Sequence, residues 1–409
     1  MQSTTLRALG SIFVTYPQLM IEERSVKIMD EIFEKDDIND KIQILKVIQK
    51  YLIADENKKE KVKKDEKDEK EITTKVTVEE LVGENEKDSE SNVGPRIIQR
   101  YLKPIMKCSL SNNKNLSLPA IDIVEFIVKQ GLSHPMESLT TLIALECNPS
   151  IKVSNKAKAL HKILNQKYQS LLNNQYLNSV IVAVKYQLNL VGDSKGCIKC
   201  DDETYESKLS YWFNLNDDKR LIKLDFLIGL LKFFNIDLNK RSISNFNQFN
   251  VEVAKFLSDN ILNFNYKSNE EVLLIGKLII NYLSNQGEQL RDLINIEKDK
   301  YDEYDYNLGL ITIVYQILIY LKIKLKSMFG FNEQQFINYK LKKKSTFNEK
   351  LIHKINKDEN LINYNNIPGS INYLKNDNDV KQQFESYLNL LDDQIPEIDI
   401  DDDDIQMDA

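Results

Sequence analysis

The chain has 409 residues, of which 42% are hydrophobic and 29% are charged, so it can bury a core. It contains only 12 Gly and 8 Pro residues. Sandwiches, barrels and doubly wound sheets need many glycine and proline turns, so this scarcity excludes an all-β fold and predicts a mostly helical protein. Four cysteines, without a signal-like N-terminus, argue against a secreted disulfide scaffold.

The net charge of −7 combines regions of opposite sign. Residues 392–409 contain nine acidic residues and no basic one, so the rest of the chain carries a net charge of +2. Its positive charge is concentrated in residues 93–121, 147–192 and 322–357, which hold five, six and ten basic residues. Such stretches can meet phosphate groups or an acidic protein surface, and they can equally be solvated helix faces.

Apolar residues recur every three to four positions over most of the chain, which is typical of amphipathic helices. The best-delimited helix pair lies between residues 116 and 146. Ser117 is expected to cap its first helix, with Pro119 in the first turn. Gly131 is expected to end that helix in the left-handed conformation, and Pro135 to begin the second. The other helices are expected at 25–33, 41–52, 157–171, 175–190, 219–234, 251–262, 271–283, 308–327 and 380–391.

Paired helices joined by short turns predict an all-α, HEAT-type α-solenoid of antiparallel helix pairs. We expect HEAT-like helices in residues 1–54 and 94–191, and further solenoid helices with looser loops in 192–391. Residues 55–93 form an insert that is expected to be flexible, because nearly all of its first positions are charged. The acidic tail, residues 392–409, is expected to be disordered.

Two apolar segments are informative, one at the start of the chain and one in residues 308–321. Leu6, Leu9 and Phe13 have the pattern of a core-facing helix with nothing before it to cover them. This pattern indicates either an unusual capping helix or the C-terminal part of a longer protein, and we favour the second. The apolar run from Leu308 to Leu321 is too short to span a bilayer and predicts a helix buried in protein, with no membrane partner.

No segment has the pattern of a catalytic, metal or cofactor site. Cys197 and Cys200 have CxxC spacing, but structural zinc needs four ligands and the other two cysteines are isolated. Residues 192–196 lack the glycine spacing of a phosphate loop. Residues 131–135 resemble a nucleophile elbow, except that proline stands where glycine is needed. We therefore expect no enzyme activity, no metal and no cofactor.

Two binding hypotheses remain. The first is that lysine-bearing helix faces hold duplex DNA through phosphate contacts, which give affinity without sequence readout. Its candidate residues are Lys152, Asn155, Lys156, Lys158, Lys162, Lys322, Lys324, Lys326, Lys342, Lys343 and Lys344. The second is that a protein partner docks on the concave face of the solenoid. Residues 205–213, which include the single tryptophan, Trp212, either anchor such a partner or belong to the core.

Four segments of the sequence resemble the C-terminal conserved region of the Nipped-B/NIPBL cohesin loaders. They are LRALGSIFVTYPQLM (6–20), DKIQILKVIQKYL (40–52), PRIIQRYLKPI (95–105) and, above all, IVKQGLSHPMESLTTLIALECNPSIKVSNKAKALHKI (127–163). Their order, the charged insert between the second and third, and the acidic end also fit this family. Weaker similarity continues through residues 220–234 and 322–331.

The resemblance implies a hook-shaped HEAT-repeat protein of the nucleus that loads cohesin onto chromosomes for sister chromatid cohesion. It implies contacts with double-stranded DNA and with the kleisin and SMC heads of cohesin, whose ATP hydrolysis the family stimulates without being an ATPase itself. Family members are much longer, and the N-terminal segment that binds the smaller loader subunit has no counterpart in this chain. The alternative is a generic helical-repeat scaffold, such as a transport receptor or adaptor. Convergence of the basic stretches on one face would favour the loader.

Overall fold

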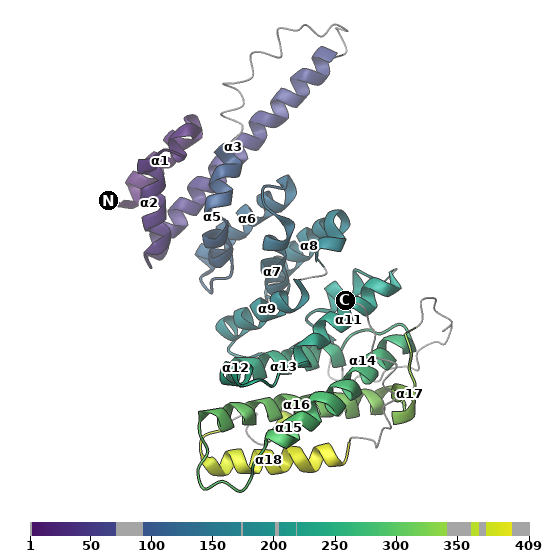
Figure 1. Ribbon diagram of the computed structural model, residues 1–409. Helices are drawn as coiled ribbons and strands as arrows, with labels where there is room; N and C mark the ends of the chain where they lie inside the picture. Colours follow the sequence, from purple (N-terminus) through teal and green to yellow (C-terminus); the bar gives the residue numbers. More distant parts are fainter. Residues whose placement is uncertain are drawn as a thin grey trace. The chain divides into compact units, whose positions relative to one another are not determined.

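The computed structural model divides the chain into two compact units, Met1–Gly192 (unit 1) and Asp193–Ala409 (unit 2), and each is described by itself. Both units are built mainly of stacked helices (Figure 1), which confirms the predicted fold class. The structure describes residues 2–70, 93–172, 175–200, 204–217, 219–341, 361–367 and 374–394, without the side chains of residues 2–4 and 59–70. Most of the acidic tail, residues 395–409, lies outside this description.

Unit 1 contains one helix after another. In chain order they are α1 (Gln2–Thr15), η1 (Pro17–Met20), α2 (Glu23–Glu34), α3 (Ile38–Lys70), α5 (Val93–Ser109), α6 (Lys114–Gln130), α7 (Pro135–Glu146), α8 (Ile151–Leu172) and α9 (Tyr176–Leu190). Helix α3 packs against α1 and α6, α5 packs against α6, and α7 packs against both α8 and α9. Gly10 lets α1 approach α3 closely, because a Cβ atom there would lie 2.5 Å from Cγ2 of Val47.

Helix α3 is longer than the sequence pattern predicts. It continues to Lys70, into the segment expected to be a flexible insert, and extends past its neighbours (Figure 1). This segment is rich in Glu and Lys, which have high helix propensity, so a helix can persist there without an apolar face. Residues 71–92, the rest of the predicted insert, lie outside the described part of the chain.

The turn between α6 and α7 has the conformation that its glycine and proline predict. Gly131 ends α6 with φ of 66°, in the left-handed region. The next residue, Leu132, donates its backbone N–H to the carbonyl oxygen of Ile127 at 3.0 Å. Pro135 is the first residue of α7, where its missing N–H leaves no hydrogen bond unmade.

The beginning of α6 differs from the prediction. Its cap is Asn113, whose side chain accepts a hydrogen bond from the backbone N–H of Asn115 at 3.0 Å. Ser117 and Pro119 therefore lie inside the helix, and the expected Ser117 cap is wrong. An Asn cap four residues upstream starts the helix earlier, because its amide oxygen satisfies a backbone donor that would otherwise be exposed.

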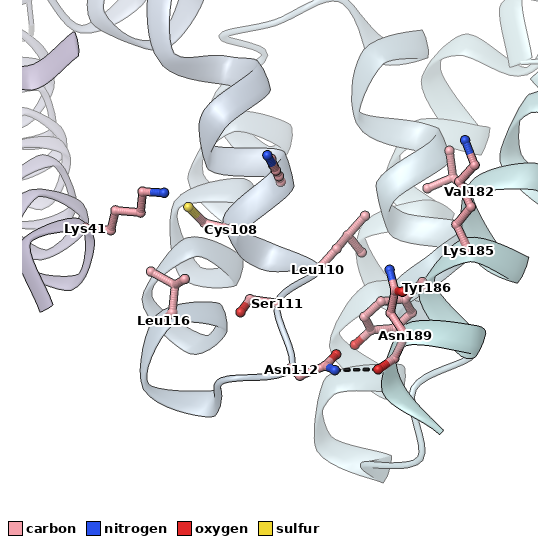
Figure 2. Close-up of a pocket in the computed structure, with 11 residues that line it drawn as sticks. Lys41, Cys108, Leu110, Ser111, Asn112, Leu116, Val182, Lys185, Tyr186 and Asn189 are labelled. Atoms are coloured by element: carbon pink, nitrogen blue, oxygen red, sulfur yellow. Dashed lines mark hydrogen bonds between the residues drawn. The ribbon is translucent and has the colours of Figure 1, made fainter. Parts of the chain in front are cut away.

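A pocket of about 600 Å³ opens in unit 1 (Figure 2). Lys41 of α3, Lys107 of α5 and Lys185 of α9 line it, together with the buried Cys108 and Tyr186. The Lys41 ammonium group and the Cys108 thiol point toward the same space. The pocket thus combines apolar and basic walls.

Unit 2 begins with a short hairpin and continues with helices. In chain order the elements are β1 (Cys197–Lys199), β2 (Tyr205–Ser207), α10 (Ser210–Asn214), α11 (Arg220–Leu231), η4 (Lys232–Phe234), α12 (Lys240–Ser244), α13 (Gln248–Leu262), α14 (Asn269–Tyr282), η5 (Leu283–Gly287), α15 (Glu288–Leu293), α16 (Glu303–Phe329), α17 (Glu333–Ile337), η7 (Tyr364–Asn366) and α18 (Asp377–Asp392). Helix α16 packs against α12, α13, α14 and α18.

Helix α16 contains the apolar run identified in the sequence. Within the described residues, it is the one helix long and apolar enough, by length and composition, to cross a membrane. Its most apolar window is 83% buried inside the protein. Such burial is that of a core helix.

The antiparallel hairpin of β1 and β2 is not predicted by the sequence. It lies on α13 through Asp259, whose carboxylate accepts the backbone N–H of Gly196 at 3.0 Å and the hydroxyl of Tyr364 at 2.6 Å. A Cβ atom on Gly196 would lie 2.2 Å from the carbonyl oxygen of Phe256, so only glycine allows this close approach. The contact between the hairpin and α13 fixes the start of unit 2.

The aromatic segment that follows belongs to the core. Trp212 is 1% exposed, and its ring centroid lies 5.1 Å from that of Phe226. Phe213 stacks on Phe264 at 4.4 Å. Of the two roles left open for this segment, the structure supports packing, and Trp212 has no surface to offer a partner.

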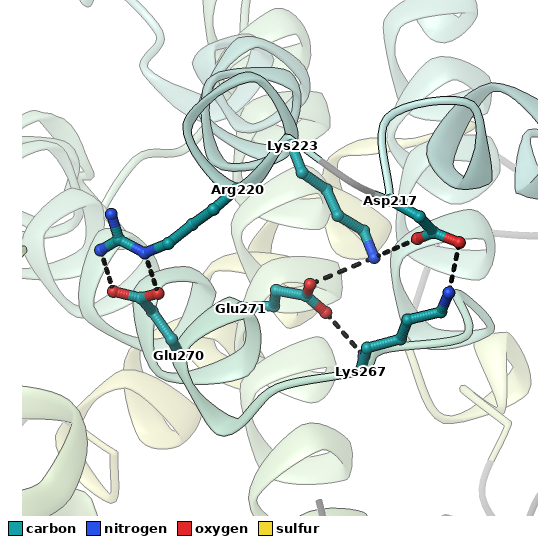
Figure 3. Close-up of polar contacts among 6 residues, drawn as sticks. All are labelled: Asp217, Arg220, Lys223, Lys267, Glu270 and Glu271. Carbon is teal, nitrogen blue, oxygen red and sulfur yellow. Dashed lines mark hydrogen bonds and ion pairs between the residues drawn. The ribbon is translucent and has the colours of Figure 1, made fainter. Parts of the chain in front are cut away.

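Lys223 of α11 is at the centre of a buried charge network (Figure 3). Its side chain is 4% exposed, and its Nζ lies 2.8 Å from Oδ1 of Asp217 and 3.1 Å from Oε1 of Glu271. The same ammonium group lies 4.0 Å from the ring centroid of Phe213. Two carboxylates and an aromatic face therefore replace the water that this cation loses.

The network continues on both sides of Lys223. Arg220 donates two hydrogen bonds to Glu270, from Nε at 2.6 Å and from Nη2 at 2.5 Å. Lys267 reaches Asp217 with its Nζ at 2.6 Å. Because Glu270 and its neighbour Glu271 lie in the first turn of α14, the network fastens α11 to the positive end of that helix.

Replacing Lys223 by Met should destabilise unit 2, because Asp217 and Glu271 lose a shared partner in a buried place. We expect the free energy of unfolding to fall by about 3 kcal/mol. Urea unfolding followed by the fluorescence of Trp212 measures this change. The control, Lys232→Met at an exposed position, should change the free energy by less than about 0.5 kcal/mol. Equal effects of the two substitutions would contradict the structural role of Lys223.

The same network makes unit 2 sensitive to acid. Burial alone raises the pKa of the Asp217 carboxyl, but the ammonium groups of Lys223 and Lys267 hold that pKa below its ordinary value. A lowered pKa stabilises the folded state above the ordinary carboxyl pKa of about 3.9, and this contribution is lost as the pH falls through the lower, folded value.

Acid titration of the wild-type chain and of Asp217→Asn tests this linkage. Between neutral pH and about pH 3, the Asn variant should lose less unfolding free energy than the wild type, because one linked carboxyl is absent. Urea unfolding at each pH, again followed by Trp212 fluorescence, gives the two values. The same loss in both chains would show that Asp217 does not contribute.

Candidate nucleic-acid interface

The predicted DNA-binding residues of α8 do not share one environment. The buried side of this helix carries Ala157 and Leu160 and packs against α7. Lys152, Asn155 and Lys162 are exposed on another side. Asn155 follows Lys152 by three positions, and Lys162 follows Asn155 by seven, a spacing that places the three side chains on one face of a helix. These three residues form the α8 stripe.

Lys156 is held by acidic side chains instead. Its Nζ lies 2.6 Å from Oδ1 of Asp122 and 2.5 Å from Oε2 of Glu125, both on α6. Burial alone lowers the pKa of Lys156, but the two carboxylates raise it above its ordinary value. Lys156 therefore joins α8 to α6, and Lys158 lies half-buried at the edge of the stripe.

The second predicted cluster is mostly engaged inside unit 2 or not described. Lys322 is fully buried, and its Nζ donates to Oε1 of Glu333 and to the carbonyl oxygen of Gln394, both at 2.7 Å. Lys326 donates to the other oxygen of Glu333 at 3.0 Å. In contrast to the prediction, Lys322 cannot reach a phosphate group at the surface, because it lies in the interior between α16, α17 and the end of α18.

The remaining candidates add little to a second site. Lys324 is half-buried on α16. Lys342, Lys343 and Lys344 lie outside the described residues. The α8 stripe belongs to unit 1, and α16 belongs to unit 2.

The structure also shows a basic site that the sequence pattern does not predict. Lys41, Lys107 and Lys185 line the same pocket, although they come from three helices far apart in the chain. Lys107 and Lys185 fall in two of the basic stretches, but no local spacing relates either of them to Lys41. Only the packing of α3, α5 and α9 brings them together.

The two cysteines of the CxxC pair differ in exposure. Within the residues that the structure describes, no group of three or more His, Cys, Asp or Glu side chains could hold a metal ion. Cys197 is buried, and its burial, together with the negative charge of Asp259, raises its pKa to about 12. Its thiol therefore stays protonated at neutral pH, when it is a poor ligand and nucleophile. Cys200 is exposed.

The contrast between Lys156 and Lys152 can be tested by substitution. Lys156→Met should destabilise unit 1 by about 1 kcal/mol, because two partly buried carboxylates lose a partner. Lys152→Met should have almost no effect, because its side chain is exposed. Hydrogen–deuterium exchange of peptides from α6 and α8 reports the difference. Equal protection in both variants would show that Lys156 does not hold the two helices together.

Comparison with known proteins finds sequence relatives of this chain. Residues 94–282, from α5 to α14, match the family described as "Sister chromatid cohesion C-terminus". The human Nipped-B-like protein is 25% identical over 293 residues, which cover 71% of this chain and 10% of that protein. Sister chromatid cohesion protein mis4 of Schizosaccharomyces pombe is 27% identical over 165 residues, which cover 39% of this chain and 10% of that protein. The chain thus spans about a tenth of these relatives.

A solved structure shares the fold. The C-terminal fragment of the cohesin loader SCC2 from Chaetomium thermophilum matches with a TM-score of 0.70 and 16% sequence identity. The match covers 94% of this chain and 25% of that one. The sequence matches and the shared fold together confirm the resemblance of this chain to the C-terminal region of the Nipped-B/SCC2 cohesin loaders.

Proposed function

We propose that this chain takes part in loading cohesin onto chromatin for sister chromatid cohesion, as a non-catalytic helical region of a loader. The observation that carries the proposal is the family match over residues 94–282, which includes α8. The partners are cohesin, through its SMC heads and kleisin, and double-stranded DNA. The place of action is the nucleus, on chromosomes. Stimulation of the cohesin ATPase belongs to the same proposal.

The α8 stripe is the surface that we assign to DNA. Lys152 and Lys162 present ammonium groups to solvent, and Asn155 between them can donate a hydrogen bond to a phosphate oxygen. Lys158 at the edge of the stripe can add a further charge. Such a surface neutralises phosphates without reading bases, so its affinity depends on salt and not on sequence.

A salt titration of duplex DNA binding tests this assignment. The double variant Lys152→Glu/Lys162→Glu should show a smaller slope of log affinity against log salt, by about 0.9 for each phosphate that is no longer neutralised. Fluorescence anisotropy of a short labelled duplex gives the slope for each protein. Lys156 is left unchanged because it holds α8 to α6.

The matched control is Lys27→Glu/Lys46→Glu, which makes the same change of charge at exposed positions of α2 and α3. Its slope should stay close to that of the wild type. Equal slopes in both variants would contradict the assignment of DNA binding to the α8 stripe. Absence of DNA binding by the wild-type chain as well would favour the alternative, a helical scaffold that binds only proteins.

A further inference from the structure

The pocket in unit 1 is a site whose role neither the fold nor the family match accounts for. It has a volume of about 600 Å³, within the range of pockets that hold a ligand or a short peptide segment. Asn112, in the turn after α5, donates a hydrogen bond to the backbone carbonyl of Asn189 on α9 and closes one side (Figure 2). None of the lining residues belongs to α8, so the pocket is separate from the α8 stripe.

The rim of the pocket is positively charged. It carries Lys41, Lys107 and Lys185, and no acidic side chain lines the pocket. Within the described residues, neither Lys41 nor Lys107 forms an ion pair, whereas Lys156 and Arg100 of the same unit are each held by carboxylates. Burial raises the pKa of the Cys108 thiol, and the charges of Lys41 and Lys107 act in the opposite direction.

The apolar part of the lining, called the floor below, consists of Leu110, Leu116, Val182 and the ring of Tyr186. Leu116 and Tyr186 are buried. An anion without apolar groups, such as a nucleic-acid backbone, would leave this floor in contact with water. A peptide that alternates carboxylates and aliphatic side chains satisfies both the rim and the floor.

We propose that this pocket binds a short acidic segment of a protein partner. Carboxylates of the segment lie against Lys41, Lys107 and Lys185, and one aliphatic side chain fills the floor beside Cys108. The segment brings negative charge to Lys41 and Lys107, which form no ion pair within the described residues, so its binding gives these two cations a partner. The site supplies a protein contact in addition to the DNA contact of α8, and it stands whether or not α8 binds DNA.

A synthetic peptide with the sequence IPEIDIDDDDIQMDA, which is residues 395–409 of this chain, is a suitable probe because it combines isoleucines with many acids. It is labelled with fluorescein and added to the full chain, and binding is followed by anisotropy. The triple variant Lys41→Glu/Lys107→Glu/Lys185→Glu should bind it about tenfold more weakly or worse. The matched triple Lys27→Glu/Lys46→Glu/Lys50→Glu, at exposed positions, should bind within about twofold of the wild type.

Two altered peptides test the rim and the floor separately. A peptide with all acids changed to amides should lose binding, because the lysines have no charge to meet. A peptide with all isoleucines changed to serine keeps its charge and should bind several-fold more weakly, because nothing fills the floor. Far-UV circular dichroism of each triple variant shows that it is folded, and Lys107→Ala provides a milder second variant that should weaken binding in the same direction.

Three results would overturn the proposal. Equal weakening by the two triple variants would mean that the peptide responds to net charge alone. Binding of the serine peptide as tightly as the unaltered peptide would show that the floor does not contribute. Displacement of the probe by short duplex DNA, together with loss of DNA binding in the Lys41/Lys107/Lys185 variant, would assign the pocket to nucleic acid. The α8 titration is measured independently, so failure of either site leaves the other intact.

Discussion

In each unit one helix is buried on nearly every side, and the other helices must cover it. In unit 1 this helix is α7, where Leu142, Ile143 and Ala144 are consecutive and fully buried. In unit 2 it is α16, packed by α12, α13, α14 and α18. A helix without a polar face cannot lie at the surface, since each exposed square ångström of apolar area costs about 25 cal/mol. The helices that cover α7 include α8 and α9, so their outer faces carry the polar residues. The exposure of Lys152 and Lys162 is thus a consequence of the burial of α7.

Lysines that look alike in the sequence have different roles in the structure. Lys223 and Lys322 are buried and neutralised by carboxylates, and each fastens helices within unit 2. Lys156 joins α8 to α6, in the middle of a stretch where its neighbours are solvated. The role of each lysine depends on whether packing brings an acid to it. For Lys156 the two acids lie on another helix, and Asp122 is 34 residues away in the sequence. A count of charges along the chain therefore cannot separate structural lysines from surface lysines.

The sequence predicts those features of the fold that depend on local chemistry. Gly131 ends α6 because a left-handed residue is needed there, and Pro135 begins α7 because its fixed φ suits a first turn. The start of α6 is ambiguous in the sequence, since Asn113 and Ser117 can both cap a helix, and in the structure Asn113 makes the capping hydrogen bond. The β1–β2 hairpin has no alternating pattern, because its strands are three residues long and are held by Asp259 of α13. The pocket is likewise invisible locally, since Lys41, Lys107 and Lys185 meet only in the folded unit.

The residues that carry the family resemblance also divide into those that the fold requires and those that lie at the surface. Gly131, Pro135 and Ala157 form turns or core, so the demands of the fold are sufficient to explain them, whereas Asn155 is exposed on the α8 stripe. Exposed lysines add little to stability, because a solvated charge gains almost nothing from folding. Substituting them therefore leaves the helices in place, so that any change in binding can be attributed to the lost charges. Charge reversal at the stripe and at the pocket consequently tests the two proposed contacts separately.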